Sequence, residues 1–187
     1  EIKDALAYLR LVTNRDSDPA FERVVNVPPR GIGARTVEII RQQARADRTS
    51  LWAGAQSLCE SDALPGRAKS ALSAFISLIE QLARDAADHD LPEKIDLAIS
   101  RSGLIDHYRK ERGEKAITRV ENLEELVSAG RNFESEANED DTLDELSNFL
   151  AHAALEAGEG QAAEWEDCVQ LMSLHSAKGL EFPLVFL

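Results

Sequence analysis

Two glycines separated by one apolar residue lead into a predicted helix over residues 34–46. The segment 29–33, PRGIG, has the form of the turn in a helix-hairpin-helix element. Glycine lets a phosphate approach the backbone, and the free N–H groups of the first helical turn, aided by the helix dipole, can then bind the anion. Thr36 could add a hydroxyl, and Arg35 and Arg41 could add a positive field. Because such a turn contacts no base edges, we expect any binding of nucleic acid to be independent of base sequence.

A plainer interpretation of the same segment is a tight turn between two helices, which is what a lone Gly-x-Gly usually is. If Gly33 has a positive φ, a β-branched residue there is expected to disturb the turn. The uneven charge of the chain favours an anion as ligand. Six arginines and only two acids lie in 23–48, whereas 134–145 carries seven acids and no base. The arginines are Arg23, Arg30, Arg35, Arg41, Arg45 and Arg48.

A second polar segment, 175–181, lies between two apolar runs, 169–174 and 183–187. Short apolar runs of this kind indicate buried strands, and the loop that leaves a strand is a common place for ligand groups. The alternative is a solvated turn in which Gly179 supplies a positive φ. Two strands need a larger sheet to satisfy their backbone groups. We therefore expect the chain to be part of a longer protein and to enter a second domain near its end.

The rest of the chain is typical of a helical domain, because apolar residues recur at helical spacing between breaks rich in glycine, proline and acids. The expected fold is mainly α: an irregular multi-helix domain at 1–166 with the helix-hairpin-helix-like turn, and a short β segment at 167–187. Thr49 or Ser50 is expected to cap the fourth helix, and Thr142 the last. The predicted helices are 2–13, 19–25, 34–46, 50–58, 65–88, 91–101, 104–111, 117–133 and 142–155.

Composition excludes several classes of protein. The net charge of −13 argues against a protein that coats DNA generally. No apolar run has the length of a membrane span. Two distant cysteines, Cys59 and Cys168, suit the reducing cytoplasm, and the histidines have no metal-ligand spacing, so no metal is expected. The sequence contains no GxxxxGK[ST] loop for a triphosphate.

Three segments resemble the superfamily 1 DNA helicases of the UvrD, Rep and PcrA type. They are VVNVPPRGIGARTVE at 24–38, TRVENLEEL at 118–126 and LMSLHSAKGLEF at 171–182. The resemblance implies a 2B domain followed by motif V of domain 2A. It implies that Glu181 binds the ribose of ATP and that Ser173 and His175 contact single-stranded DNA. The residues implied to contact duplex DNA are Arg30, Gly31, Ile32, Gly33, Arg35 and Thr36.

The function implied by this resemblance is that of an ATP-dependent 3′-to-5′ DNA helicase of DNA repair, with ATP and Mg²⁺ as cofactors of the intact protein. Its partners would be DNA, the remaining helicase domains and repair proteins. The chain alone is expected to be inactive. Residues 118–126 carry no evident chemistry, and we interpret Arg119, Glu121 and Asn122 as a hydrogen-bond cluster that fixes helix packing. An acidic helical protein-interaction domain remains an alternative, whereas a self-contained hydrolase would need a nucleophile or metal cluster that the sequence does not show.

Overall fold

The computed structural model describes residues 1–61, 63–111, 113–133 and 144–158, and these residues form helices with no strand among them. The prediction of a mainly α fold is confirmed. The predicted β segment and the predicted boundary at 166 and 167 lie outside the described residues. The chain divides into two units, Glu1–Ala153 and Ala154–Leu187. The helices of the first unit are α1 (Ile2–Thr13), α2 (Asp18–Val24), α3 (Ala34–Asp47), α4 (Leu51–Glu60), α5 (Gly66–Asp85), α6 (Leu91–Ser102), α7 (Leu104–Arg109), α8 (Glu114–Asn132) and α9 (Glu145–Gly158), the last of which runs into the second unit.

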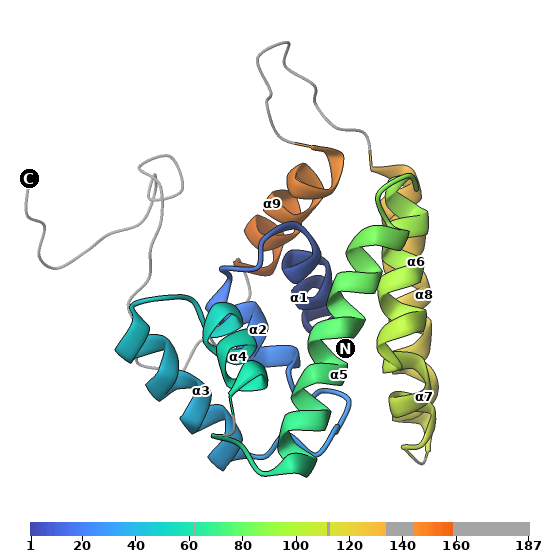
Figure 1. The fold of residues 1–187 in the computed structure, drawn as a ribbon. Coiled ribbons are helices and arrows are strands. Elements are labelled where there is room, and N and C mark those ends of the chain that lie inside the picture. The colour runs from blue at the N-terminus through green and yellow to red at the C-terminus, as the bar shows by residue number, and fades with distance from the viewer. Residues whose placement is uncertain (62, 112, 134–143, 159–187) are drawn as a thin grey trace, which may run out of the picture. The chain divides into compact units, whose positions relative to one another are not determined.

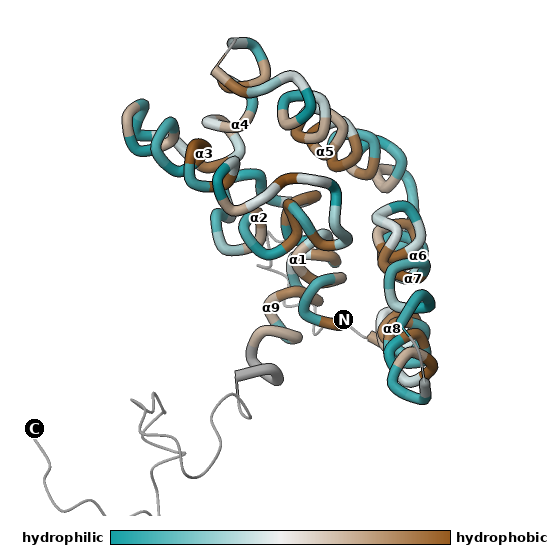
Figure 2. The backbone as a smooth tube through the Cα atoms, turned by 90° about the horizontal axis from the view of Figure 1, so that it is seen from below, coloured by the Kyte–Doolittle hydropathy of each residue, from teal (hydrophilic) through white to brown (hydrophobic). Residues whose placement is uncertain are grey.

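Helix α1 is the centre of the first unit. It packs against α2, α5, α6 and α8, while α3 packs on α4 and α4 on α5 (Figure 1). The buried residues of α1 are small or apolar apart from Asp4 and Tyr8, and Ala5, Leu9 and Leu11 are at most 1 % exposed. Polar and apolar residues alternate along each helix at the helical period, as the hydropathy colouring shows (Figure 2). Each helix therefore buries one stripe against the others.

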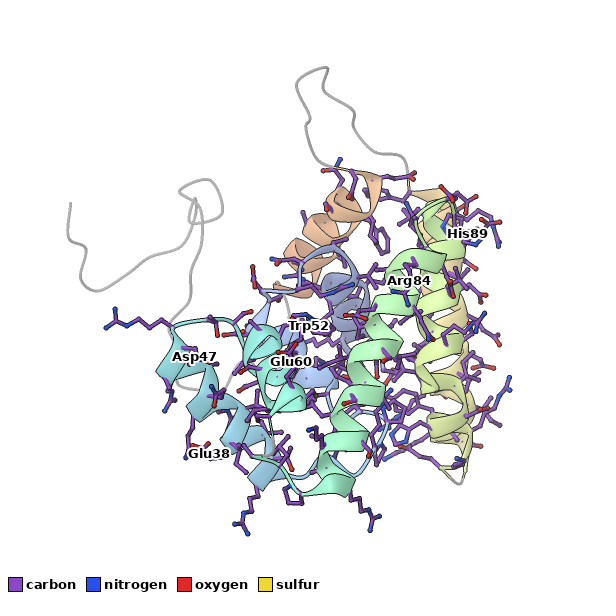
Figure 3. All side chains as sticks on the ribbon, viewed as in Figure 1. Glu38, Asp47, Trp52, Glu60, Arg84 and His89 are labelled. Carbon is purple, nitrogen blue, oxygen red and sulfur yellow. The ribbon has the colours of Figure 1, made fainter. Side chains whose placement is uncertain are left out.

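An aromatic cluster joins α2, α4 and α5. The ring of Phe21 lies edge-to-face on Trp52 and on Phe75, with centroids 6.5 and 5.7 Å apart. Figure 3 shows Trp52 between the ribbons of α4 and α5. The Arg15 guanidinium lies 5.0 Å from the centre of the Trp52 ring. Edge-to-face pairs add about 0.5–1.5 kcal/mol each to the burial of their area, so this cluster fixes the α3–α4 pair on the central helices.

Side-chain caps define several helix starts. Ser50 accepts a hydrogen bond from the Ala53 N–H, as the sequence indicated, and Asp90 caps α6 through the N–H of Glu93. At α9 the Asp144 carboxylate accepts from the Ser147 N–H at 2.7 Å, so the cap lies at Asp144, whereas the sequence predicted Thr142, which is outside the described residues. An aspartate next to the first helical turn satisfies a free N–H and also suits the helix dipole.

Candidate nucleic-acid interface

Two residues, Asn26 and Ile32, connect the glycine turn at 29–33 to the body of the domain. Asn26 accepts hydrogen bonds through Oδ1 from the N–H groups of Arg30 and Ile32, at 2.8 and 3.2 Å. The Ile32 side chain is 1 % exposed and belongs to the core. Gly31 has a φ of 84°, so it occupies the left-handed region that favours glycine. The turn is thus tied to the interior at two points, with its glycines on the outside.

Helix α3 begins directly after this turn with an open N-terminus. Gly33 is its N-cap residue, and its carbonyl accepts from the N–H groups of Thr36 and Val37. Within the described part of the chain, no group accepts from the backbone N–H of Gly33, Ala34 or Arg35, and these residues are exposed. Three adjacent free donors at the positive end of a helix dipole are the groups that a phosphate oxygen would need as donors.

The space over the two glycines is empty. A Cβ atom built on Gly31 or Gly33 would meet no atom within 4 Å. Gly33 has φ −80° and ψ 171°, which any residue adopts. A β-branched residue at position 33 was expected to disturb the turn only if Gly33 has a positive φ. In the structure it is Gly31, and not Gly33, that has a positive φ. Nothing in the described structure therefore requires glycine at position 33.

Arg30 is half-buried, and its guanidinium is turned towards the body of the domain. Its two terminal nitrogens donate to the carbonyls of Pro28 and Ser102, both at 2.9 Å, to the Val24 carbonyl at 3.3 Å, and to the Tyr8 hydroxyl at 2.5 Å. The guanidinium also lies between the rings of Tyr8 and Phe75, with centroids 5.7 and 5.6 Å away. All of these contacts are intramolecular, so Arg30 positions the turn.

The structure divides the residues that the sequence assigned to duplex DNA into two groups. Gly31, Gly33 and Arg35 are exposed, together with the N–H groups of the first turn of α3. Ile32 and Thr36 are buried, at 1 % and 9 % exposure. Arg30 donates its hydrogen bonds to groups of the same domain. The exposed group alone forms a surface that a polyanion could reach. The sequence did not indicate Asn26 or Tyr8, because their contacts to the turn depend on the tertiary fold.

Tyr8 closes the hydrogen-bond network around Arg30. Its hydroxyl donates to the Val27 carbonyl at 2.6 Å while it accepts from Arg30. Burial raises the pKa of Tyr8 to about 12, even though Arg30 acts in the opposite direction. The pKa of Tyr108 is also raised, first by burial and then by its hydrogen bond to the Asp4 carboxylate at 2.5 Å. These are the two tyrosines of the chain.

Both tyrosines are expected to titrate late. The ordinary pKa of a tyrosine in an unfolded chain is about 10, and the folded state keeps its protons to higher pH. The contribution of these tyrosines to the free energy of unfolding is therefore complete below pH 10. It is lost as the pH rises from 10 towards 12. A spectrophotometric titration of phenolate absorbance should show no transition near pH 10 in the folded chain. Two tyrosines that ionise normally, with the fold intact by circular dichroism, would contradict the buried network.

The six arginines of 23–48 also divide by environment. Arg23 pairs with Asp4 at 2.7 Å and Arg41 pairs with Glu22 at 2.5 Å. With Arg30 turned towards the body of the domain, three arginines are left without an ion-pair partner among the described residues. They are Arg35, Arg45 and Arg48. The positive field predicted for this region is thus concentrated on α3 and its C-terminus.

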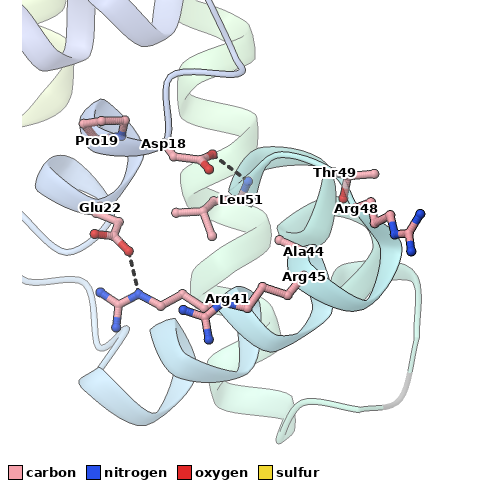
Figure 4. Close-up of a pocket in the computed structure, with 9 residues that line it drawn as sticks. All are labelled: Asp18, Pro19, Glu22, Arg41, Ala44, Arg45, Arg48, Thr49 and Leu51. Atoms are coloured by element: carbon pink, nitrogen blue, oxygen red, sulfur yellow. Dashed lines mark hydrogen bonds and ion pairs between the residues drawn. The ribbon is translucent and has the colours of Figure 1, made fainter.

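A cleft of about 450 Å³ lies between α2, α3 and the start of α4, and Arg45 and Arg48 line it. Arg41 reaches Glu22 there, while Arg48 points away from both carboxylates of the cleft (Figure 4). The second carboxylate, Asp18, accepts a hydrogen bond from the Leu51 N–H at 2.8 Å. The acids of the cleft are therefore already engaged, whereas Arg45 and Arg48 are available. At 1.5 Å per residue, roughly 20 Å of helix separates them from the glycine turn.

Residues 118–126 help to fix helix packing, but with other partners than the sequence indicated. Arg119 donates to Glu111 at 2.8 Å, and Asn122 donates to Glu1 at 2.8 Å. Glu121 is exposed and takes no part, because it projects from a different side of α8. These hydrogen bonds join α8 to the segment that follows α7 and to the start of α1, and periodicity within one helix cannot show such contacts.

The second predicted site cannot be placed: Ser173, His175 and Glu181 lie outside the described residues. The described residues form no group of three side chains that could hold a metal ion. Nor does any helix in them combine the length and hydropathy that a membrane crossing requires. They also contain no glycine-rich triphosphate loop.

The geometry defines a helical domain with an open, exposed N-terminus of α3 and exposed arginines at both ends of the same helix. The sequence profile of the UvrD-like helicase C-terminal domain matches residues 1–187, and the chain belongs to this family. It is 57 % identical over its whole length to DNA helicase II of Escherichia coli and 51 % identical to DNA helicase II of Haemophilus influenzae. It is 38 % identical to ATP-dependent DNA helicase PcrA of Bacillus subtilis. The chain spans about a quarter of the length of these relatives, 26 %, 26 % and 25 % respectively.

Proposed function

We propose that this chain is the duplex-contacting and regulatory 2B-type domain of an ATP-dependent 3′-to-5′ DNA helicase of DNA repair, followed from about residue 167 by the start of the second part of domain 2A. The observation that carries the proposal is the open N-terminus of α3, where the N–H groups of Gly33, Ala34 and Arg35 have no intramolecular acceptor among the described residues. The phosphate backbone of a duplex is a matching acceptor, and binding through it would be independent of base sequence.

Gly33 supports the same proposal. The described structure gives no internal reason for glycine there, because φ is ordinary and a side chain would have room. An external group that approaches the backbone closely would supply one, since any side chain at this position would stand between it and the free N–H groups. The adjacent Arg35 adds a charge that suits a phosphate.

The affinity of the isolated chain for DNA is expected to be low. Its net charge of −13 repels a polyanion, and only the surface of α3 attracts one. At low salt the local attraction extends further, with a screening length of about 30 Å at 0.01 M against about 8 Å at physiological salt. Binding should therefore be measurable mainly at low ionic strength.

ATP and Mg²⁺ would act in the remainder of the longer protein. The name of the Bacillus subtilis relative describes an ATP-dependent DNA helicase. In the proposed assignment Glu181 contacts the ribose of ATP, and Ser173 and His175 contact single-stranded DNA. The chain alone should neither hydrolyse ATP nor unwind DNA, because phosphoryl transfer needs a phosphate cradle and a bound metal.

The arginines of the cleft provide a test. Replacing both Arg45 and Arg48 with alanine should weaken duplex binding severalfold and lower the salt slope by about one for each phosphate that is no longer neutralised. The measurement is duplex affinity across a salt series by fluorescence anisotropy, with Arg84→Ala on α5 as the control for removal of an exposed arginine (Figure 3). Equal effects of the cleft variant and the control per charge removed would show that only net charge matters.

The acidic protein-interaction domain is the competing assignment. It predicts that the chain, with its net charge of −13, does not bind duplex DNA even at low salt. If the wild-type chain and the Arg45/Arg48 variant both fail to bind duplex DNA at low ionic strength, while circular dichroism shows both folded, a protein-interaction role replaces the duplex-contact role of this helicase domain.

A further inference from the structure

One large apolar side chain is strongly exposed among the described residues: Ile117, at 62 %. It begins a row on α8 that continues through Val120, Glu124, Val127 and Arg131. The spacing alternates between three and four residues, so all five lie on one flank of the helix. At 1.5 Å per residue the row is roughly 21 Å long, which corresponds to about four turns of a helix laid against it.

A groove borders each half of this row, which we call the α8 flank. The first groove, of about 310 Å³, lies between Arg109 of α7 and residues 116–124 of α8. The second, of about 540 Å³, lies between the start of α6 and residues Val127 and Arg131 of α8. Leu97 and Pro92 contribute apolar surface to the second groove. The flank therefore offers one strongly exposed apolar side chain, Ile117, and two half-buried ones, Val120 and Val127, with spaces on its border where side chains of a partner could enter.

The charge of the α8 flank is negative. Its two grooves are lined by five carboxylates and two guanidinium groups, a difference of three negative charges, and by His89, whose ring bonds to Glu93 at 2.7 Å. The carboxylates are those of Asp90, Glu93, Asp96, Glu121 and Glu124, all exposed. The flank thus combines an apolar row with an acidic border, and its natural complement is an apolar row with a basic border.

This charge argues against two other occupants. A second copy placed on the same surface by two-fold symmetry would bring two sets of excess carboxylates together. The segment that follows α8 in sequence carries seven acids and no base in 134–145, so it too has the wrong sign. Both alternatives would bury like charges.

We infer that the α8 flank is a docking site for a basic amphipathic helix of another protein. Such a helix would place branched apolar residues at alternating spacings of three and four against Ile117, Val120 and Val127, and lysines or arginines against the carboxylates. The polar border indicates a partner that associates and dissociates. Interfaces that are permanently closed are more apolar and have fewer charges. This site is separate from the glycine turn, so it does not depend on the proposed contact with DNA.

The test uses the 187-residue chain and a synthetic, helix-stapled peptide of about four turns, with leucines at the alternating spacing and lysines on either side. Binding is measured by fluorescence anisotropy at low and physiological salt. Glu121→Lys combined with Glu124→Lys should weaken binding about tenfold or more, and Ile117→Ser should weaken it severalfold. Glu60→Lys on α4 is the matched control for charge reversal at an exposed helix position and should leave affinity within about twofold (Figure 3).

A second peptide in which every lysine is replaced with glutamate checks the sign of the charge. The inference is supported if only the basic peptide binds and only the α8 variants lose affinity. It is overturned if both peptides bind alike, if the control weakens binding as much as the double variant, or if neither peptide binds at millimolar concentration. Sedimentation of the chain alone completes the test, since self-association that Ile117→Ser abolishes would make a second copy the occupant.

Discussion

Replacing Arg30 with methionine is expected to lower the free energy of unfolding by about 3–5 kcal/mol, because the carbonyls of Pro28 and Ser102 and the Tyr8 hydroxyl lose the donor that Arg30 supplies. The Val24 carbonyl loses one donor but keeps the Val27 N–H. Each buried acceptor that is left without a partner costs about 1–3 kcal/mol. Methionine keeps much of the apolar contact with the rings of Tyr8 and Phe75. The destabilisation would therefore come from the hydrogen bonds rather than from packing. Urea denaturation followed by circular dichroism measures it.

Arg30→Lys separates a positioning role from a direct contact with phosphate. Lysine keeps the charge but lacks the planar fork that reaches several acceptors at once, so the stability of Arg30→Lys should stay close to that of the methionine variant. If Arg30 contacted phosphate instead, lysine would largely restore duplex binding, and neither variant would be much less stable than wild type. A lysine variant with wild-type stability would therefore contradict the network that we describe.

Gly33→Val is expected to weaken duplex binding by about tenfold to a hundredfold at low salt while leaving the fold intact. The expected change corresponds to about 1.5–3 kcal/mol for charge-assisted hydrogen bonds that a phosphate can no longer make with the first turn of α3. Folding should be spared because φ is −80° and the position of the new side chain is empty. Anisotropy with a short blunt duplex, together with a thermal melt, measures both quantities.

A second glycine serves as the control for this prediction. Gly66 is also exposed at the start of a helix, α5, and a Cβ there would meet no atom within 4 Å. Gly66→Val should leave duplex affinity unchanged. Gly31→Val differs from both, because its φ of 84° makes any side chain strained, so it should lower stability as well as affinity. If Gly33→Val and Gly66→Val bind duplex DNA equally well, the turn has only a structural role.

The periodic part of the sequence predicted the helices well. The bounds predicted for the first helix, 2–13, are those of α1. The prediction is accurate there because the apolar periodicity ends where the polar segment after the helix begins. At α8 the structure begins at Glu114, earlier than the predicted residue 117. The first turn of α8 is polar apart from Ala116, so the periodicity of apolar residues does not reveal it. Helix starts that depend on caps or polar turns are thus the least visible in sequence.

The candidate site was predictable in position but not in the role of each residue. The glycines and α3 were found because turn chemistry is local. Whether Arg30 faces solvent or the interior depends on Tyr8 and Ser102, which are 22 and 72 positions away. Likewise, the partner of Asn122 is Glu1, 121 positions away, and periodicity within α8 suggested a neighbour on the same helix. The hydrogen-bond partners of side chains with several donors are determined by the tertiary fold.

The hydrogen bond from Arg30 to the Ser102 carbonyl has a consequence for how the domain assembles. Contacts that join distant parts of a chain must wait until the intervening segment is ordered, because closing a long loop costs entropy. On the ribosome, α1 to α3 leave the exit tunnel well before Ser102 is synthesised. The glycine turn should thus be among the last parts of the domain to become rigid. A nascent chain halted before α6 would contain the PRGIG sequence without its final geometry.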